Sequence, residues 1–135
     1  MGKVFVLGGS GFVGNNFLVA LSCSKDEEFS EIVSLDLTFP AVRVEKVKYI
    51  ICDITDSNAL KELLLEHQPK YLINLAGILR SVSLNEMLRV NLLPSDTVMD
   101  FAAQNGFPER IILIGSAAEY GIPKSNPVSE EDSLS

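Results

Sequence analysis

The residues that could do chemistry begin with a glycine-rich segment near the N-terminus, residues 8–14 (GGSGFVG). Its spacing places Gly8 where a strand turns sharply, Gly11 where the backbone approaches a bound group, and Gly14 where a helix packs on the strand. Because free N–H groups at a helix start attract anions, the segment predicts a dinucleotide diphosphate site. The alternative is a glycine-rich turn that only joins two elements. The residues expected to bind the cofactor here are Gly8, Gly11, Phe12, Val13 and Gly14.

Acidic residues follow the next two predicted strands. Asp36 ends the second strand, where a carboxylate can accept hydrogen bonds from both ribose hydroxyls and would repel a 2′-phosphate. This favours NAD over NADP, although Arg43 in the following loop would favour NADP if it reached the ribose. Asp53 and Ile54 follow the third strand, where a carboxylate can reach the adenine amino group. The alternatives are an ordinary turn or capping aspartate at Asp36 and a helix cap at Asp53.

Apolar runs of strand length alternate with amphipathic segments of helix length. The predicted strands are Lys3–Leu7, Glu31–Leu35, Lys46–Ile51, Tyr71–Leu75 and Arg110–Ile114. The predicted helices are Gly11–Ser22, Asp56–His67 with Asp56 or Thr55 as N-cap, and Leu84–Gln104 with a kink or restart at Pro94. Because parallel neighbours need long, right-handed crossovers, this alternation predicts an α/β fold with a Rossmann-type doubly wound parallel sheet in the order 3-2-1-4-5. A ligand crevice is expected at the carboxyl ends of the first and fourth strands.

The composition excludes several classes of function. The chain has 135 residues and a net charge of −7, from 11 Lys and Arg against 18 Asp and Glu, without a basic cluster. That balance argues against nucleic acid or a membrane surface as partner, and no apolar run approaches the ~20 residues of a membrane span. Cys23 and Cys52 have no metal-ligand spacing, so we expect no metal and interpret both as reduced thiols of a cytoplasmic protein. His67 is expected to be solvated at a helix C-terminus.

The order of these motifs resembles the extended short-chain dehydrogenases/reductases, which are the NAD-dependent sugar-nucleotide epimerases and dehydratases. The segments that carry the resemblance are Gly8–Gly14, Asp36, Asp53–Ile54, Asn74–Gly77, Val90–Asn91 and Gly115–Gly121. The resemblance extends to Glu131, and the motifs are specific together although each alone is weak. It implies NAD as cofactor and a nucleotide sugar as the substrate of the full-length protein.

The resemblance also implies roles for single residues. The residues that would line the cofactor after the fourth strand are Leu75, Ala76 and Gly77. Asn91 would be the structural asparagine of the long helix and belongs to the expected cofactor-binding residues, and Asn74 stands where many members have histidine. Ser116 would be the catalytic serine whose hydroxyl bonds the reacting sugar oxygen, with a helix or turn cap as the alternative. Tyr120 would be a pocket residue, with a packed aromatic as the alternative.

One departure from the family concerns its catalytic Tyr-x-x-x-Lys pair, which should follow the serine by a few tens of residues. In such a pair the tyrosinate exchanges the hydroxyl proton during hydride transfer, and the lysine lowers the pKa of the tyrosine. Tyr120 and Lys124 match the spacing, but Gly121 and Pro123 predict a loop where the pair needs one helix face. The chain as given is therefore expected to bind cofactor weakly and to catalyse nothing.

A second departure concerns the positions after the serine, where 4,6-dehydratases place an acidic residue. Those positions are Ala117 and Ala118, and Glu119 comes one place late. The sequence therefore favours an NAD-dependent sugar-nucleotide epimerase or 4-keto-sugar reductase over a dehydratase. The alternative from another class is a non-catalytic NAD(P)-binding sensor or interaction module, which would need neither Ser116 nor a Tyr-x-x-x-Lys pair.

We interpret residues 1–121 as an incomplete NAD(P)-binding Rossmann domain and residues 122–135 as a loop leading to a missing C-terminal portion. The predicted fifth strand is apolar on both faces but has a neighbour on one side only, which is an association hazard. We therefore expect the natural protein to continue beyond Ser135, with coverage of this edge by another copy as the alternative. The full-length protein is expected to be a homodimer.

Overall fold

The computed structural model describes residues 2–24, 29–80, 83–122 and 126–132. Its five parallel strands form one sheet in the order β3-β2-β1-β4-β5, which confirms the predicted topology. The strands are β1 (Gly2–Leu7), β2 (Phe29–Asp36), β3 (Val47–Ile51), β4 (Tyr71–Asn74) and β5 (Arg110–Leu113). The helices are α1 (Phe12–Cys23), α2 (Ser57–His67), α3 (Leu84–Asn91), α4 (Leu93–Asn105) and the short 3-10 helix η1 (Ala117–Tyr120).

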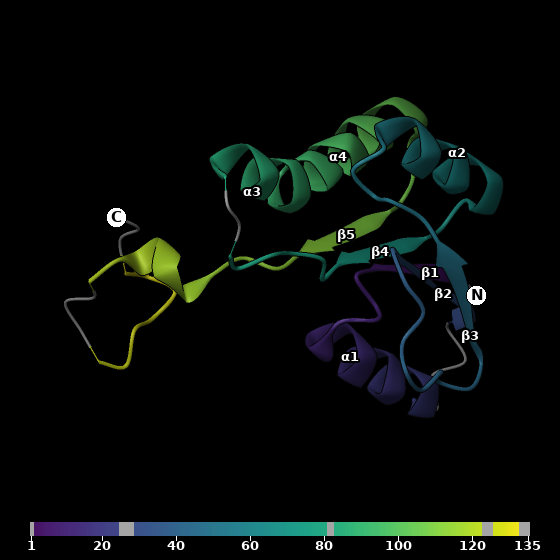
Figure 1. Cartoon of the computed structure of the whole chain (residues 1–135), viewed down its shortest axis with the longest axis horizontal. Helices are drawn as coiled ribbons and strands as arrows, with labels where there is room; N and C mark the ends of the chain where they lie inside the picture. The colour runs from purple at the N-terminus through teal and green to yellow at the C-terminus, as the bar shows by residue number, and fades with distance from the viewer. Residues whose placement is uncertain (1, 25–28, 81–82, 123–125, 133–135) are drawn as a thin grey trace.

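The sheet lies between two helical layers, with α1 on one face and α2, α3 and α4 on the other (Figure 1). Side chains of β1 alternate between these layers because successive residues of a strand point to opposite faces. Val4 and Val6 join the core beside Leu18 of α1, whereas Phe5 and Leu7 join the core beside α2 and α4. Burial on both faces explains why residues 4–7 of β1 are all apolar.

Local sequence features explain where α2 and α4 begin. Asp56 is the N-cap of α2, because its Oδ1 accepts hydrogen bonds from the N–H groups of Asn58 and Ala59 at 3.0 and 3.1 Å. The predicted helical stretch from residue 84 to 104 is two helices that meet at Leu92, and Pro94 lies in the first turn of α4. The restart predicted at Pro94 is thus confirmed.

The prediction that His67 is solvated is wrong. Its side chain is 8% exposed, and its ring lies 5.4 Å from the ring of Phe5, centroid to centroid. The last turn of α2 packs over the sheet at this point, so a position that looks terminal in sequence is interior in space. Nε2 lies 3.8 Å from the Glu66 carboxylate.

Within the described residues, β5 pairs with β4 alone, as the sequence predicted for the fifth strand. Ile112 and Leu113 are 47% and 44% exposed. The chain then leaves the sheet, and η1 lies apart from the helical layers (Figure 1).

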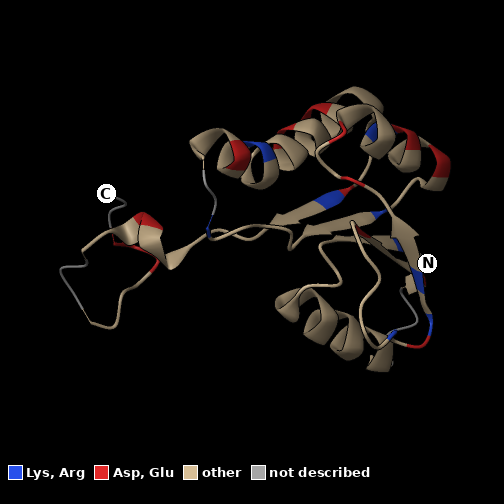
Figure 2. Cartoon of the chain, viewed as in Figure 1, with Lys and Arg blue, Asp and Glu red and all other residues tan. Residues whose placement is uncertain are grey.

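Charges are spread unevenly over the two layers. Acidic side chains gather on α2, α3 and α4, whereas α1 carries no charged residue (Figure 2). No helix in the described part of the chain is both long and apolar enough to cross a membrane.

Candidate functional site

A cavity of about 500 Å³ opens at the carboxyl ends of β1 to β4, beneath α3. Eight of the residues predicted to bind cofactor line it, namely Gly8, Gly11, Asp36, Asp53, Ile54, Leu75, Ala76 and Gly77. The predicted site residues that do not line it are Phe12, Val13, Gly14, Asn91 and Ser116. The crevice is where the direction of strand order reverses, which is the usual ligand position in such sheets.

The glycine-rich turn leaves the start of α1 open. Gly8 has φ +79°, and its N–H donates to the Leu35 carbonyl at 2.9 Å. Gly11 is the N-cap of α1 and provides no side-chain cap. Within the described ranges, the backbone N–H groups of Phe12, Val13 and Gly14 donate to no acceptor. These donors and the positive end of the helix dipole remain available to an anion.

Gly14 and Gly11 of this turn have different structural roles. A Cβ on Gly14 would collide with the Gly8 carbonyl oxygen and lie 2.7 Å from the Gly9 Cα, so this glycine allows α1 to pack on the turn. A Cβ on Gly11 would meet only the Gly8 oxygen at 3.4 Å, and this residue borders the cavity. The space beside Gly11 is therefore open toward the cavity.

Gly9 was not among the predicted site residues, and its role is structural. A Cβ there would collide with Ser34 Oγ of β2 and lie 2.9 Å from Leu18 Cδ1 of α1. Ser34 Oγ is buried and has no hydrogen-bond partner in the described structure. The close contact of turn, strand and helix fixes the position of the turn.

Asp36 lies at the edge of the crevice, and its carboxylate is fixed by backbone groups. Oδ2 accepts a hydrogen bond from the Ser10 N–H at 2.9 Å, and Oδ1 accepts one from the Leu37 N–H at 2.7 Å. Ser10 Oγ also donates to the Thr38 carbonyl at 2.7 Å, which ties the glycine-rich turn to the loop after β2. Each carboxylate oxygen keeps a further lone pair for a ligand. Arg43 stacks on Phe39, 4.1 Å from its ring centroid, and does not line the cavity.

Asp53 is not the cap of α2, since Asp56 has that position. Its Oδ1 accepts hydrogen bonds from the Thr55 N–H at 2.9 Å and the Thr55 hydroxyl at 2.7 Å. Its Oδ2 lies 3.6 Å from Nη2 of Arg89 on α3. The hydrogen bonds from Thr55, with the nearby charge of Arg89, lower the pKa of Asp53, so the carboxylate is ionised at neutral pH.

The segment after β4 is held by two asparagines. The Asn74 amide donates to Ser95 Oγ at 3.0 Å, and its Oδ1 accepts from the Ala76 N–H at 3.1 Å. Asn91 accepts from the Ile78 N–H at 2.8 Å and donates to the Ile78 carbonyl at 2.9 Å. These bonds hold the segment that forms one wall of the crevice, so Asn91 acts on the site without lining it.

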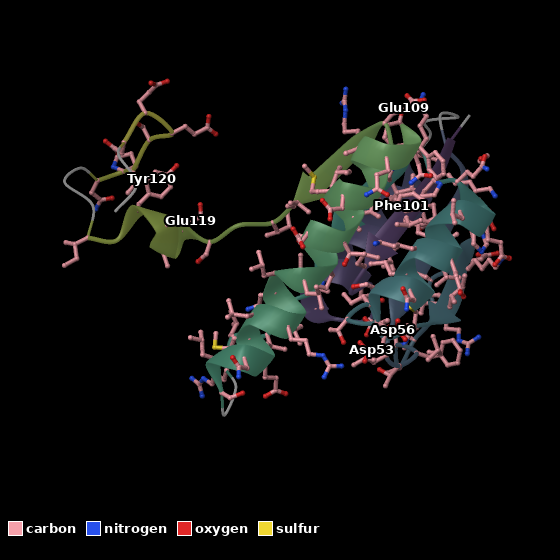
Figure 3. The ribbon with its side chains drawn as sticks, turned by 90° about the horizontal axis from the view of Figure 1, so that it is seen from above. Asp53, Asp56, Phe101, Glu109, Glu119 and Tyr120 are labelled. Atoms are coloured by element: carbon pink, nitrogen blue, oxygen red, sulfur yellow. The ribbon has the colours of Figure 1, made fainter. Side chains whose placement is uncertain are left out.

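Ser116 lies on the segment beyond β5 and is the N-cap of η1. Its Oγ accepts from the Ala118 N–H at 3.1 Å, and its own N–H donates to Glu119 Oε1 at 2.8 Å. Glu119 and Tyr120 lie well apart from Asp53 and Asp56 in Figure 3. This arrangement matches the capping alternative and does not bring Ser116 to the crevice. Tyr120 and Lys124 match the spacing of the catalytic Tyr-x-x-x-Lys pair, and Pro123 predicts a loop between them. Pro123 and Lys124 lie outside the described residues.

Several residues that line the crevice were missed from the sequence, namely Ser10, Leu37, Thr38, Thr55, Glu86, Arg89 and Val90. The signal for Arg89 was its place directly before the Val90-Asn91 pair, on a helix that was already expected near the site. The signal for Thr55 was its position two residues after Asp53, a spacing at which a backbone N–H commonly donates to an aspartate side chain.

A model of the NAD dependent epimerase/dehydratase family matches residues 4–135. The dTDP-L-rhamnose 4-epimerase of Burkholderia thailandensis is 31% identical over 133 residues, covering 88% of this chain and 36% of that protein. The crystal structure of Bordetella bronchiseptica WbmG in complex with NAD and UDP has a TM-score of 0.80 and 20% identity, over 98% of this chain and 43% of its own. For the UDP-Glc/GlcNAc 4-epimerase of Campylobacter jejuni, the TM-score is 0.81 and the identity 21%, over 100% of this chain and 43% of that one.

The sheet order and the crevice define a Rossmann-like α/β protein. The chain belongs to the NAD dependent epimerase/dehydratase family, because the family model matches nearly all of it. It spans 36% of the length of the curated relative and 43% of the length of the two solved structures.

Proposed function

We propose that this chain binds NAD in the crevice and is the cofactor-binding part of a nucleotide-sugar epimerase or 4-keto-sugar reductase. The observation that carries the proposal is the combination of unpaired N–H groups at the start of α1, a bare backbone at Gly11 and the fixed carboxylate of Asp36 at one cavity. A dinucleotide needs these three features for its diphosphate and its adenosine ribose.

The described residues fit NAD. The diphosphate would lie over Gly11 and receive the N–H groups of the first turn of α1. The remaining lone pairs of Asp36 would accept hydrogen bonds from the ribose hydroxyls, and their negative charge would disfavour the 2′-phosphate of NADP. Oδ2 of Asp53 would accept from the adenine amino group. Bound NAD supplies a hydride acceptor and donor, and these residues hold and orient it.

The relatives support a nucleotide sugar as substrate. One is named for a dTDP-sugar and another for UDP-sugars, and both names state a 4-epimerase. The Glu119 side chain bonds the Ser116 N–H within a capping box, so it is already engaged structurally, which counts against the acid of a dehydratase. In the whole protein we propose that Ser116 orients the sugar, which is the role that the family resemblance implies for it.

The position of Ser116 also favours a second candidate, a non-catalytic NAD(P)-binding sensor or interaction module. Such a protein would keep Gly11 and Asp36 but would not need a serine at the crevice. Sequencing the coding region downstream of Ser135 separates the two candidates. A Tyr-x-x-x-Lys pair within the next few tens of residues supports the enzyme, and its absence there supports the sensor.

Isothermal titration calorimetry of the chain with NAD and NADP tests the cofactor. We expect NAD to bind more tightly, and Asp36→Ala to weaken NAD more than NADP. Asp100→Ala, an exposed aspartate of α4 away from the cavity, is the matched control and should change neither affinity. Thermal melting checks that each variant folds. Equal losses for both nucleotides would contradict the ribose role of Asp36, and a failure to bind either nucleotide would refute the proposal.

We further propose that the full-length protein works in the cytoplasm as a homodimer. Both cysteines are free thiols, which suits a reducing compartment. The exposed apolar side chains of β5 need covering. Light scattering of the full-length protein measures its oligomeric state, and a monomer at micromolar concentration would contradict the dimer.

A further inference from the structure

Arg89 links two walls of the crevice. It lies on α3, a helix without buried residues, and reaches the loop between β3 and α2. Its Nε and Nη2 donate to Thr55 Oγ1 at 3.1 and 2.9 Å, across 34 residues of sequence. Among the described residues that line the cavity, Arg89 is the only lysine or arginine. The side chain of Arg89 is therefore held at the site by polar contacts.

The contacts of Arg89 determine how Asp53 presents its two oxygens. Thr55 Oγ1 accepts two hydrogen bonds from the guanidinium, so its own hydrogen points to Asp53 Oδ1, 2.7 Å away. The Thr55 N–H occupies the same oxygen. Oδ2 has no hydrogen bond within the described ranges, and it faces the guanidinium at 3.6 Å through charge alone. Arg89, Thr55 and Asp53 thus form a chain of contacts in which Oδ2 of Asp53 accepts no hydrogen bond from a described residue.

We propose that Arg89 is a positioning residue that selects adenine in the bound dinucleotide, by holding Asp53 through Thr55 with Oδ2 free to accept the exocyclic amino group. This inference rests on the proposed function, because it assigns the adenine of NAD to this side of the crevice. The Asp53 side chain is 45% exposed and would otherwise sample other rotamers. Adenine offers an N–H donor to Oδ2, whereas hypoxanthine offers a carbonyl oxygen that the carboxylate repels.

The test compares NAD with nicotinamide hypoxanthine dinucleotide, in which a carbonyl replaces the exocyclic amino group and the neighbouring N1 carries a hydrogen. Calorimetry gives Kd for both nucleotides with the wild-type chain, Arg89→Gln, Arg89→Lys and Thr55→Val. We expect the wild type to bind NAD about tenfold more tightly than the hypoxanthine dinucleotide, because one hydrogen bond to a charged group contributes about that factor. Arg89→Gln and Thr55→Val should reduce that preference to about threefold or less by weakening NAD alone, and Arg89→Lys should retain part of it.

The matched control is Arg110→Gln, an exposed arginine of β5 that does not line the cavity, and it should leave both affinities unchanged. If Arg89→Gln weakens both nucleotides by the same factor, Arg89 acts only through its general charge or through α3, and the inference is overturned. A wild-type chain that binds both nucleotides equally also overturns it while the NAD proposal stands. Failure of the wild type to bind NAD at all overturns both.

Discussion

Gly11 and Gly14 lie three residues apart in one turn, yet the structure predicts that alanine at Gly14 lowers stability and that alanine at Gly11 lowers the affinity for NAD. At Gly14 the added Cβ would collide with the Gly8 carbonyl oxygen, and backbone must move to admit it. Overpacking of this kind costs about 3 kcal/mol at the upper end of its range, and the better helix propensity of alanine returns about 1 kcal/mol. We expect Gly14→Ala to lower the free energy of unfolding by about 2 kcal/mol, and Tm by about 8 °C.

At Gly11 the backbone is extended, with φ −71° and ψ 171°, and the nearest atom to the added Cβ is 3.4 Å away. The change removes only the preference of glycine over alanine as an N-cap, about 1 kcal/mol or less. The Cβ would however occupy the space proposed for the diphosphate. We expect Gly11→Ala to melt within about 4 °C of the wild type and to bind NAD at least about tenfold more weakly.

Differential scanning calorimetry and isothermal titration of the same preparations measure the two effects. Each variant controls for the other, because one should lose stability and the other should lose affinity. The reasoning fails if Gly14→Ala melts like the wild type, which would mean that the turn yields easily. It also fails if Gly11→Ala keeps the wild-type affinity for NAD, which would place the diphosphate elsewhere.

Three further predictions follow from the site. The lowered pKa of Asp53 means that the unfolded chain binds more protons than the folded chain. Asp53 therefore stabilises the fold above its unfolded pKa of about 4, and this contribution disappears as the pH falls through the lower pKa of the folded state. Urea midpoints between about pH 2 and pH 5 should therefore fall less steeply with acid in Asp53→Asn than in the wild type, and parallel curves would contradict this. Burial, with the charges of Asp53 and Asp56, raises the pKa of Cys52, so mass spectrometry should find iodoacetamide on the exposed Cys23 at least about tenfold faster, and equal rates would contradict its burial. Asn91→Ala should lower the free energy of unfolding by about 1 kcal/mol, because two exposed hydrogen bonds to Ile78 are lost, and an unchanged urea midpoint would show that they contribute nothing.

Strand ends were predicted to within about two residues, and the differences have local causes. β3 begins at Val47 because Lys46 has φ +68°, a left-handed conformation that stops a strand. β4 ends at Asn74, whose side chain caps the next segment by accepting from the Ala76 N–H. Hydrophobic patterns carry little information about such single-residue conformations.

The candidate site was predicted well where residues end a strand and poorly where they reach across the fold. Asp36, Asp53 and Ala76 line the crevice because the carboxyl ends of parallel strands meet at one edge. Arg89 was missed because its partners depend on the angle at which α3 crosses the sheet. No local pattern reports that angle.

The amino-acid sequence by itself determined the order of the elements, the parallel pairing and the glycine-rich turn. These follow from the periodicity of apolar residues and from rules that act over a few neighbouring residues. Tertiary structure alone decided that His67 is interior, that the Ser10 amide bonds Asp36, and that Ser116 lies away from the crevice. These outcomes depend on packing between segments distant in sequence, or on the path that the chain takes after its last strand, and neither is encoded by the spacing of residue types within one element.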